Sequence, residues 1–173
     1  MLGADKASLT EALPYRDIKP VGAADFYFAI SATFSFIHRR FGVEELRRFW
    51  TELGREYFAP VAERWKVRGL NGVEEYWRAF FAAEPGAEVE VAATADAVTL
   101  DVKVCPAICH LRAHQREILP CFCQHCYFVS EAMASPAGLT VRVAGGNGAC
   151  RQTFQRRAAG VPEQDLAEIK EAR

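Results

Sequence analysis

The sequence predicts an α+β domain in which a helical N-terminal layer packs against a small four-stranded antiparallel sheet. Three observations carry this prediction. Apolar residues recur every three or four positions over much of the first half of the chain. They alternate with polar residues in two later segments, and a turn divides each of these into a hairpin. A helical segment dense in cysteine and histidine separates the two hairpins.

Length and composition fit one such domain. The chain has 173 residues, of which 50% are apolar and 12% aromatic, which is enough to bury a core. We expect a flexible lead-in over residues 1–23, a single α+β domain over 24–155 and a charged C-terminal tail over 156–173. The helical half and the sheet-bearing half are expected to be two layers of that domain.

Charge and hydropathy argue against several classes of partner. The formal net charge is −1, with 21 basic and 22 acidic residues, so no basic field favours nucleic acid or a membrane surface. The longest uncharged apolar stretch, residues 26–37, is shorter than the roughly 20 residues of a spanning helix. The first residues carry acids and lack the apolar segment of a signal peptide. We therefore expect a cytoplasmic protein with reduced cysteines.

Three helices are predicted in the first half. The first begins after an N-cap at Asp25 and stops at Gly42. The second runs from about residue 43 to 65, with a kink or break at Pro60. The third covers about 73–83, after a turn rich in glycine and asparagine.

The period of the apolar pattern then changes from 3.6 to 2. Residues 88–93 and 98–104 alternate on either side of a turn, which predicts an antiparallel hairpin with one wet face. A second hairpin is predicted for residues 139–143 and 149–155, with Gly145-Gly146-Asn147-Gly148 as its turn. The intervening chain favours two helical segments, and the tail from Arg156 is expected to form a frayed helix.

The segment Cys105 to Cys126, CPAICHLRAHQREILPCFCQHC, holds five of the six cysteines and three of the four histidines. Thiolate and imidazole are metal ligands, and they also serve as nucleophile and base. If a helix begins at Pro106, side chains four apart can reach one ion together. Cys150, on the last strand, can return beside the cluster. The candidate metal ligands are Cys109, His110, His114, Cys121, Cys123, His125 and Cys126.

Four interpretations of this segment are open. It can hold a structural zinc ion, or a hydrolytic site in which a cysteine or a metal-bound water attacks with an imidazole as base. It can hold an iron–sulfur cluster or exchange disulfides through Cys121, Cys123 and Cys126. Alternatively, most of the thiols are small buried apolar groups. Zinc and iron are the cofactors that these donors favour, although Cys123 and Cys126 form the only C-x-x-C pair.

The arrangement resembles a known family. Helices rich in aromatic residues and arginine lead into a strand that ends at Cys105-Pro106. The cysteine group around Cys121, Cys123 and Cys126 follows, and Cys150 precedes Phe154 on the last strand. Over roughly residues 25–155 this is similar to the L-2-amino-thiazoline-4-carboxylic acid hydrolase family.

The resemblance implies a hydrolase that acts on a non-peptide carbon–nitrogen bond. In the reaction of that family, water opens a cyclic amidine bearing a carboxylate and yields an N-carbamoyl amino acid. Cys105, Cys126 and Cys150 correspond best to the family pattern, and we expect them to be catalytic together with His114 as the imidazole. One arginine would hold the substrate carboxylate, and the second predicted helix offers Arg47, Arg48 and Arg55.

The alternative is a non-catalytic sensor or accessory protein that binds zinc or an iron–sulfur cluster. A closed site with four protein ligands would indicate this function, whereas a catalytic metal keeps one open position. The expected partner of the enzyme is a small-molecule substrate that bears a carboxylate. The aromatic-rich helices would also suit a homo-oligomer.

Overall fold

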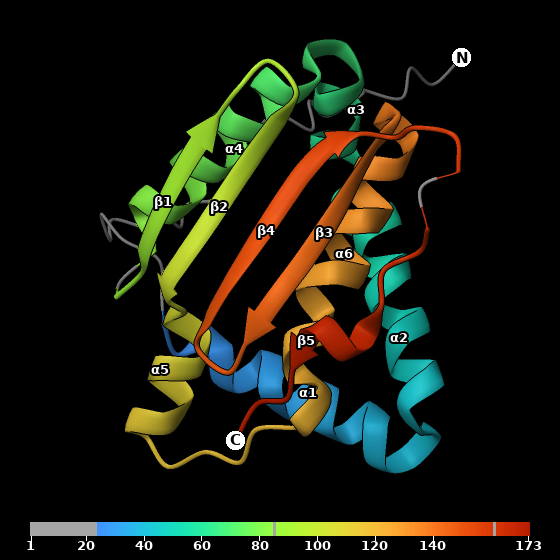
Figure 1. Cartoon of the computed structure of the whole chain (residues 1–173). Coiled ribbons are helices and arrows are strands. Elements are labelled where there is room, and N and C mark those ends of the chain that lie inside the picture. The colour runs from blue at the N-terminus through green and yellow to red at the C-terminus, as the bar shows by residue number, and fades with distance from the viewer. Residues whose placement is uncertain (1–23, 85, 161) are drawn as a thin grey trace, which may run out of the picture.

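The computed structural model describes residues 24–84, 86–160 and 162–173 as a set of helices and a mixed sheet (Figure 1). The predicted lead-in, residues 1–23, lies outside the described residues. The helices are α1 Phe26–Phe41, α2 Val43–Glu52, α3 Ala59–Arg68, α4 Leu70–Ala83, α5 Pro106–Ala113 and α6 Gln124–Ala134. The strands are β1 Glu88–Ala93, β2 Ala97–Val104, β3 Leu139–Gly146, β4 Ala149–Arg156 and β5 Ile169–Lys170. None of the described helices is long and apolar enough to cross a membrane.

The first predicted helix is confirmed, and the second is interrupted close to the predicted kink or break at Pro60. After α2 the chain forms a π-helix, Leu53–Tyr57, and then α3. Pro60 lies in the first turn of α3, where no intrahelical N–H is required, so the irregularity precedes the proline. A Cβ on Gly54 would lie 2.5 Å from the carbonyl oxygen of Val129 in α6. Glycine therefore lets the π-helix approach α6 closely.

The third predicted helix begins too late. Gly69 ends α3 with a φ of 57°, and α4 begins directly at Leu70. Asn71 and Gly72, which the sequence predicted as a turn, are therefore helical. The reversal between the two helices needs one residue in the left-handed region, and Gly69 supplies it.

Both predicted hairpins are confirmed, but the sheet has five strands rather than four. Its order is β1-β2-β4-β3-β5, and β5 is parallel to β3. A 3₁₀-helix, Leu166–Glu168, precedes β5, so the predicted frayed helix in the tail is wrong. A Cβ on Gly146 would lie 2.5 Å from the carbonyl oxygen of Lys170, so this pairing requires glycine. The side chain of Ile169 is 5% exposed and anchors the strand.

Helices α4 and α6 cover one face of the sheet (Figure 1). One core lies between this face and the helices, and it contains Trp65 and Phe154. A second core, with Trp50 and Phe122, joins α1, α2 and α5 to the start of α6. Figure 1 shows α1 and α5 at the end of the sheet where the β3–β4 hairpin turns. The junction of the two cores lies at this end.

Candidate functional site: a cluster of four cysteines

Four cysteines from separate segments lie near this junction, close enough that a charge on one affects the pKa of others, and we call them the cysteine cluster. Cys105 immediately precedes α5, and Cys123 ends the 3₁₀-helix Pro120–Cys123. Cys126 lies in the first turn of α6, and Cys150 lies on β4. All four are free thiols in partly buried residues. Cys105 and Cys123 pack against both cores.

Burial and mutual repulsion keep these thiols protonated. Burial raises the pKa of Cys105 and of Cys126 to about 12. It raises the pKa of Cys123 to about 11, and the pKa of Cys150 also rises. In each of the other three, a charge on Cys126 raises the pKa further. Cys126 is therefore the electrostatic centre of the cluster, and a nearby cation would favour its thiolate.

Backbone N–H groups partly oppose this rise in the pKa of the thiols. The N–H of Asn147 donates to Cys123 Sγ at 3.3 Å. The N–H groups of Ile108 and Ala107, at the start of α5, lower the pKa of Cys105 against the larger effect of burial. The N–H of Cys105 donates to the carbonyl oxygen of Gly148 at 2.8 Å. The turn of the β3–β4 hairpin is thus bonded to two members of the cluster.

His125 is the histidine that contacts the cluster. Its Nδ1 lies 2.6 Å from the carbonyl oxygen of Phe122. A carbonyl only accepts, so Nδ1 carries the proton and Nε2 is free to accept. Cys126 Sγ lies 3.6 Å from Nε2, so the thiol donates to the imidazole. Burial lowers the pKa of His125, which keeps the ring neutral and basic at Nε2.

A tyrosine–carboxylate pair lies close to the same thiols. The Tyr27 hydroxyl donates to Glu84 Oε2 at 2.5 Å, which joins α1 to the end of α4. The pKa of Tyr27 is raised, first by burial, then by Glu84, and finally by charges on Cys105 and Cys126. The phenol therefore stays protonated beside the cluster.

The residues that the sequence predicted as one site lie at separate places in the structure. His110 stacks on Phe28 of α1 at 4.8 Å, and its Nε2 lies 3.1 Å from Asp25 Oδ1. His114 packs edge-on against the same phenylalanine at 5.1 Å. Cys109 is exposed.

Cys121 also lies apart from the cluster. Burial raises its pKa, while the charges that act on it are those of Arg47 and Glu171. Across residues 24–84, 86–160 and 162–173, no group of three or more His, Cys, Asp or Glu side chains is arranged to hold a metal ion. The zinc or iron expected from the sequence remains a prediction.

The arginines considered for a substrate carboxylate are engaged locally. Arg47, Arg48 and Arg55 form ion pairs with the glutamates three residues before them on α2 or at its end. Arg47 also donates to Gln124 Oε1 at 3.1 and 3.2 Å.

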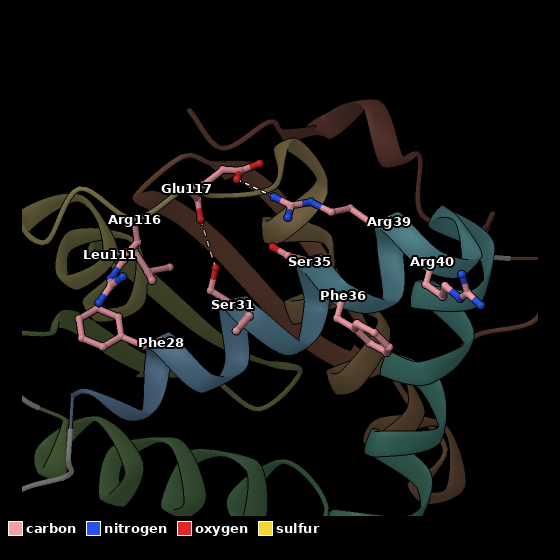
Figure 2. A pocket seen from close by; sticks show the side chains of 10 residues that line it. Phe28, Ser31, Ser35, Phe36, Arg39, Arg40, Leu111, Arg116 and Glu117 are labelled. Atoms are coloured by element: carbon pink, nitrogen blue, oxygen red, sulfur yellow. Dashed lines mark hydrogen bonds and ion pairs between the residues drawn. The ribbon is translucent and has the colours of Figure 1, made fainter.

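A groove of about 640 Å³ between α1 and the loop after α5 holds other arginines. Figure 2 shows Arg116 beside Phe28, with its guanidinium carbon 4.7 Å from the ring centre. Glu117 pairs with Arg39 at 2.6 Å, and its carbonyl accepts from Ser31. The described residues that line this groove include no cysteine.

Reasoning from sequence missed four residues at the cysteine cluster: Tyr27, Glu84, Asn147 and Gln152. Gln152 could have been identified from the sequence. It follows Cys150 and precedes Phe154 at the inward positions of the last strand, where an apolar residue is expected. The Tyr27–Glu84 pair spans 57 residues and had no local signal.

No protein-family model, curated protein or solved structure matches this chain. The family resemblance therefore stays a prediction, and the cysteine cluster is the feature of the structure that indicates a function.

Proposed function

We propose that the chain is a hydrolase that opens a carbon–nitrogen bond of a small cyclic amidine or amide at the cysteine cluster. One observation carries this proposal: the central thiol, Cys126, donates to the neutral imidazole of His125, whose tautomer the Phe122 carbonyl sets. A thiol paired with an oriented base is the arrangement that nucleophilic catalysis by cysteine requires.

The reaction follows from this pair. Cys126 Sγ forms a bond to the ring carbon of the C=N or C=O group, while its proton passes to His125 Nε2. The ring carbon–nitrogen bond then breaks, and His125 returns the proton to the leaving nitrogen. Water attacks the resulting thioimidate or thioester, which releases the ring-opened product and restores the thiol. The sum is the addition of one water molecule across the broken bond.

Neighbouring groups support these steps. The N–H groups at the start of α5 are donors close to the cluster, where negative charge would develop on the substrate. The sequence assigned the imidazole role to His114, but His114 packs on Phe28. The proposal therefore assigns the role to His125, which contacts the nucleophile.

Turnover of 2-amino-thiazoline-4-carboxylate is the direct test. The ring-opened product is measured by liquid chromatography and mass spectrometry for wild type, Cys126→Ser and His125→Gln. Its isomer is assigned too, because cleavage of the ring carbon–nitrogen bond gives the S-carbamoyl amino acid, whereas cleavage of the ring carbon–sulfur bond gives the N-carbamoyl amino acid. We expect Cys126→Ser to lower kcat/KM by at least about a hundredfold, and His125→Gln to lower it by a similar factor, as loss of a general base does. Cys109→Ser is the matched control because Cys109 is exposed, and it should stay within about twofold.

Two results would contradict the proposal. One is a wild-type protein, purified with reduced thiols, that hydrolyses no cyclic amidine or amide in a panel of carboxylate-bearing rings. The other is a Cys126→Ser variant with full activity.

The number of thiols in the cysteine cluster also favours a second candidate, a non-catalytic protein that binds zinc or an iron–sulfur cluster. Cys105, Cys123, Cys126 and Cys150 would have to move closer together to bind either group, because the described side chains are not arranged to hold a metal ion. Thiolates are the preferred ligands of both groups. Elemental analysis of protein purified without oxygen separates the candidates. About one zinc ion, or a stoichiometric set of iron atoms, per chain in a protein without turnover would favour the second.

A further inference from the structure

The groove between α1 and the loop that follows α5 holds more positive than negative charge. Three arginines line it: Arg39, Arg40 and Arg116. Its described lining contains one acidic residue, Glu117, which pairs with Arg39. Arg40 and Arg116 form no ion pair with any described carboxylate. Three positive charges and one negative charge leave a surplus of two, although the formal net charge of the whole chain is −1.

The end of α5 places Arg116 at one end of this groove. The N–H of Gln115 donates to the carbonyl oxygen of Arg112 at 3.0 Å. The N–H of Arg116 donates to the carbonyl oxygen of Leu111 at 2.9 Å, which completes a Schellman motif. Gln115 takes the left-handed position of the motif, with a φ of 52°, where glycine is usual. The chain thereby turns back towards α1, and the guanidinium carbon of Arg116 lies 4.7 Å from the ring centre of Phe28 (Figure 2).

The second surplus charge lies at the opposite end of the groove (Figure 2). Arg39 and Arg40 belong to the last turn of α1, three turns after Phe28. At about 1.5 Å per residue, the two ends are on the order of 16 Å apart along the helix axis. Glu117 neutralises one of these two arginines, so this end also carries one net positive charge.

Between its two ends the groove is lined mainly by small and apolar side chains. Helix α1 contributes Ala32 and Ser35, and α5 contributes Leu111. Phe36 also lines the groove, and its side chain is 63% exposed. The volume of about 640 Å³ lies in the range of small-molecule sites. The middle of the groove therefore suits an apolar body, and its ends suit negative charge.

Basic residues in the last turn of a helix also stabilise it by complementing its dipole. This effect accounts for Arg39 and Arg40 on α1 without any ligand. It does not account for Arg116, which reaches the groove from the loop after α5, or for the exposed ring of Phe36. The presence of a positive charge at both ends of one groove is the observation that points to a ligand.

We propose that this groove binds an elongated small molecule with a carboxylate at each end and an apolar body between them. Each end offers one surplus positive charge, and a carboxylate carries one negative charge, whereas a phosphate monoester carries about two near pH 7. A guanidinium can donate two parallel hydrogen bonds to a carboxylate. The described lining of the groove includes no cysteine, so this site is separate from the cysteine cluster and independent of the proposed hydrolase.

Three rigid ligands test the length and the charge of the occupant. Biphenyl-4,4′-dicarboxylate has a carboxylate at each end. Biphenyl-4-carboxylate has the same body with one carboxylate, and benzene-1,4-dicarboxylate has both carboxylates on a single ring. Binding of each ligand to the wild-type chain is measured by calorimetry. We expect the long diacid to bind at least about tenfold more tightly than either of the others.

Removal of one positive charge from either end should abolish the advantage of the second carboxylate. Arg116→Gln and Arg40→Gln should each weaken binding of the long diacid about tenfold, to the affinity of the monoacid, because one carboxylate loses its partner. Arg48→Gln is the matched control, since it removes the same charge from an exposed position of α2 outside the groove. It should stay within about twofold of wild type.

Glu117→Gln should act in the opposite direction. The Arg39–Glu117 pair is exposed, with side chains that are 63% and 71% accessible, so it contributes little to the fold. Its loss makes Arg39 available to the ligand, and the long diacid should bind about threefold more tightly. The melting temperature of each variant should stay close to that of wild type, because all the substituted side chains are exposed.

Equal affinity for the long diacid and the monoacid overturns the proposal, as does the absence of saturable binding by the long diacid. Equal effects of Arg40→Gln, Arg116→Gln and Arg48→Gln also overturn it, because they would show a general attraction of anions to the surface rather than a site.

Discussion

Two buried glutamines near the β3–β4 hairpin differ in how completely their side-chain amides are hydrogen-bonded. Gln164, 7% exposed, lies along the outer edge of β3, and its Oε1 accepts from the N–H of Val143 at 2.9 Å. Its Nε2 donates to the Asp165 carbonyl at 2.7 Å and to Glu168 Oε2 at 3.0 Å. Gln152, one strand away and opposite Val143, has a weak contact to sulfur and an oxygen with no partner.

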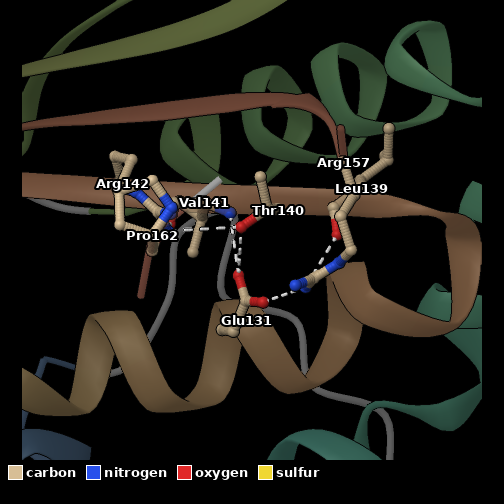
Figure 3. Close-up of polar contacts among 7 residues, drawn as sticks. All are labelled: Glu131, Leu139, Thr140, Val141, Arg142, Arg157 and Pro162. Atoms are coloured by element: carbon tan, nitrogen blue, oxygen red, sulfur yellow. Dashed lines mark hydrogen bonds and ion pairs between the residues drawn. The ribbon is translucent and has the colours of Figure 1, made fainter. Parts of the chain in front are cut away.

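Several backbone groups on the outer edge of β3 have side chains as hydrogen-bond partners. Figure 3 shows Glu131 of α6 reaching the start of β3. Its Oε2 accepts from Thr140 Oγ1 at 3.0 Å and from the N–H of Val141 at 2.9 Å, and its Oε1 pairs with Arg157. Among the described residues, β5 pairs with β3 at Gly145 and Gly146. The side chains of Glu131 and Gln164 therefore take the place of a neighbouring strand along the rest of this edge.

This difference distinguishes buried polar residues whose atoms are all hydrogen-bonded from buried polar residues that have an unpaired atom. A buried polar residue whose atoms all have partners stabilises the fold, and its removal is costly. A buried polar residue with an orphan atom contributes little to the fold. The following predictions test this distinction, beginning with the largest expected effect.

Glu131→Ala should lower the free energy of unfolding by about 3 kcal/mol, because it leaves the Thr140 hydroxyl and the Val141 N–H buried without an acceptor. The measurement is urea unfolding followed by tryptophan fluorescence. Glu45→Ala, which breaks an exposed i,i+3 pair with Arg48, is the control and should cost less than about 0.5 kcal/mol. Similar losses in the two variants would show that Glu131 does not replace a strand partner.

Gln164→Leu and Gln152→Leu should change the free energy of unfolding by different amounts or in opposite directions. Gln164→Leu leaves the Val143 N–H without an acceptor and should cost about 2 kcal/mol. Gln152→Leu removes an orphan oxygen from an apolar layer and should leave the stability unchanged or raise it by about 1 kcal/mol. The same urea experiment measures both. If Gln152→Leu were the more destabilising of the two, the distinction between the fully hydrogen-bonded amide of Gln164 and the unpaired amide oxygen of Gln152 would be wrong.

Asn147 tests how firmly the hairpin turn holds the cysteine cluster. It has a φ of 58°, and its Oδ1 accepts from Arg112 and from the N–H of Arg173. Asn147→Ala loses these bonds and strains the left-handed backbone, so it should cost about 2 kcal/mol. Asn147→Gly relieves the strain and should cost about 1 kcal/mol. A glycine variant as stable as wild type would show that the side chain contributes no net stability.

Alkaline pH should weaken the fold through the cysteine cluster. The folded-state pKa of Cys126 is raised to about 12, whereas an unfolded thiol titrates near about 8.5. The unfolded chain therefore releases this proton first, and the stabilisation that is complete below about pH 8.5 is lost as the pH rises towards 12. Between pH 8 and 10, Cys126→Ser should lose about 2 kcal/mol less than wild type in urea unfolding. Equal losses would show that Cys126 ionises as freely in the folded protein as in the unfolded chain.

Local patterns predicted most of the elements but not their irregularities. Both hairpins and α1 follow from apolar spacing that is visible within short windows. The π-helix does not, because the close approach of Gly54 to α6 joins segments about 75 residues apart. β5 was missed for a similar reason: its two residues are a strand only because glycines in β3 admit their backbone.

The cysteine cluster was predicted as a segment, and its membership was decided in three dimensions. The density of cysteine and histidine between Cys105 and Cys126 identified the right part of the chain. That density could not show that His110 and His114 turn towards Phe28 while His125 turns towards Cys126.

The sequence by itself determined the class of fold, the two hairpins and the region in which thiol chemistry is concentrated, because each depends on residues close together along the chain. Only the tertiary structure decided which thiols meet, which histidine accepts from Cys126 and which buried amide lacks a partner. Those features depend on the pairing of β4 with β2 and β3 and on the docking of α5 and α6 at one end of the sheet. Contacts of that kind join distant residues, and no local period in the sequence encodes them.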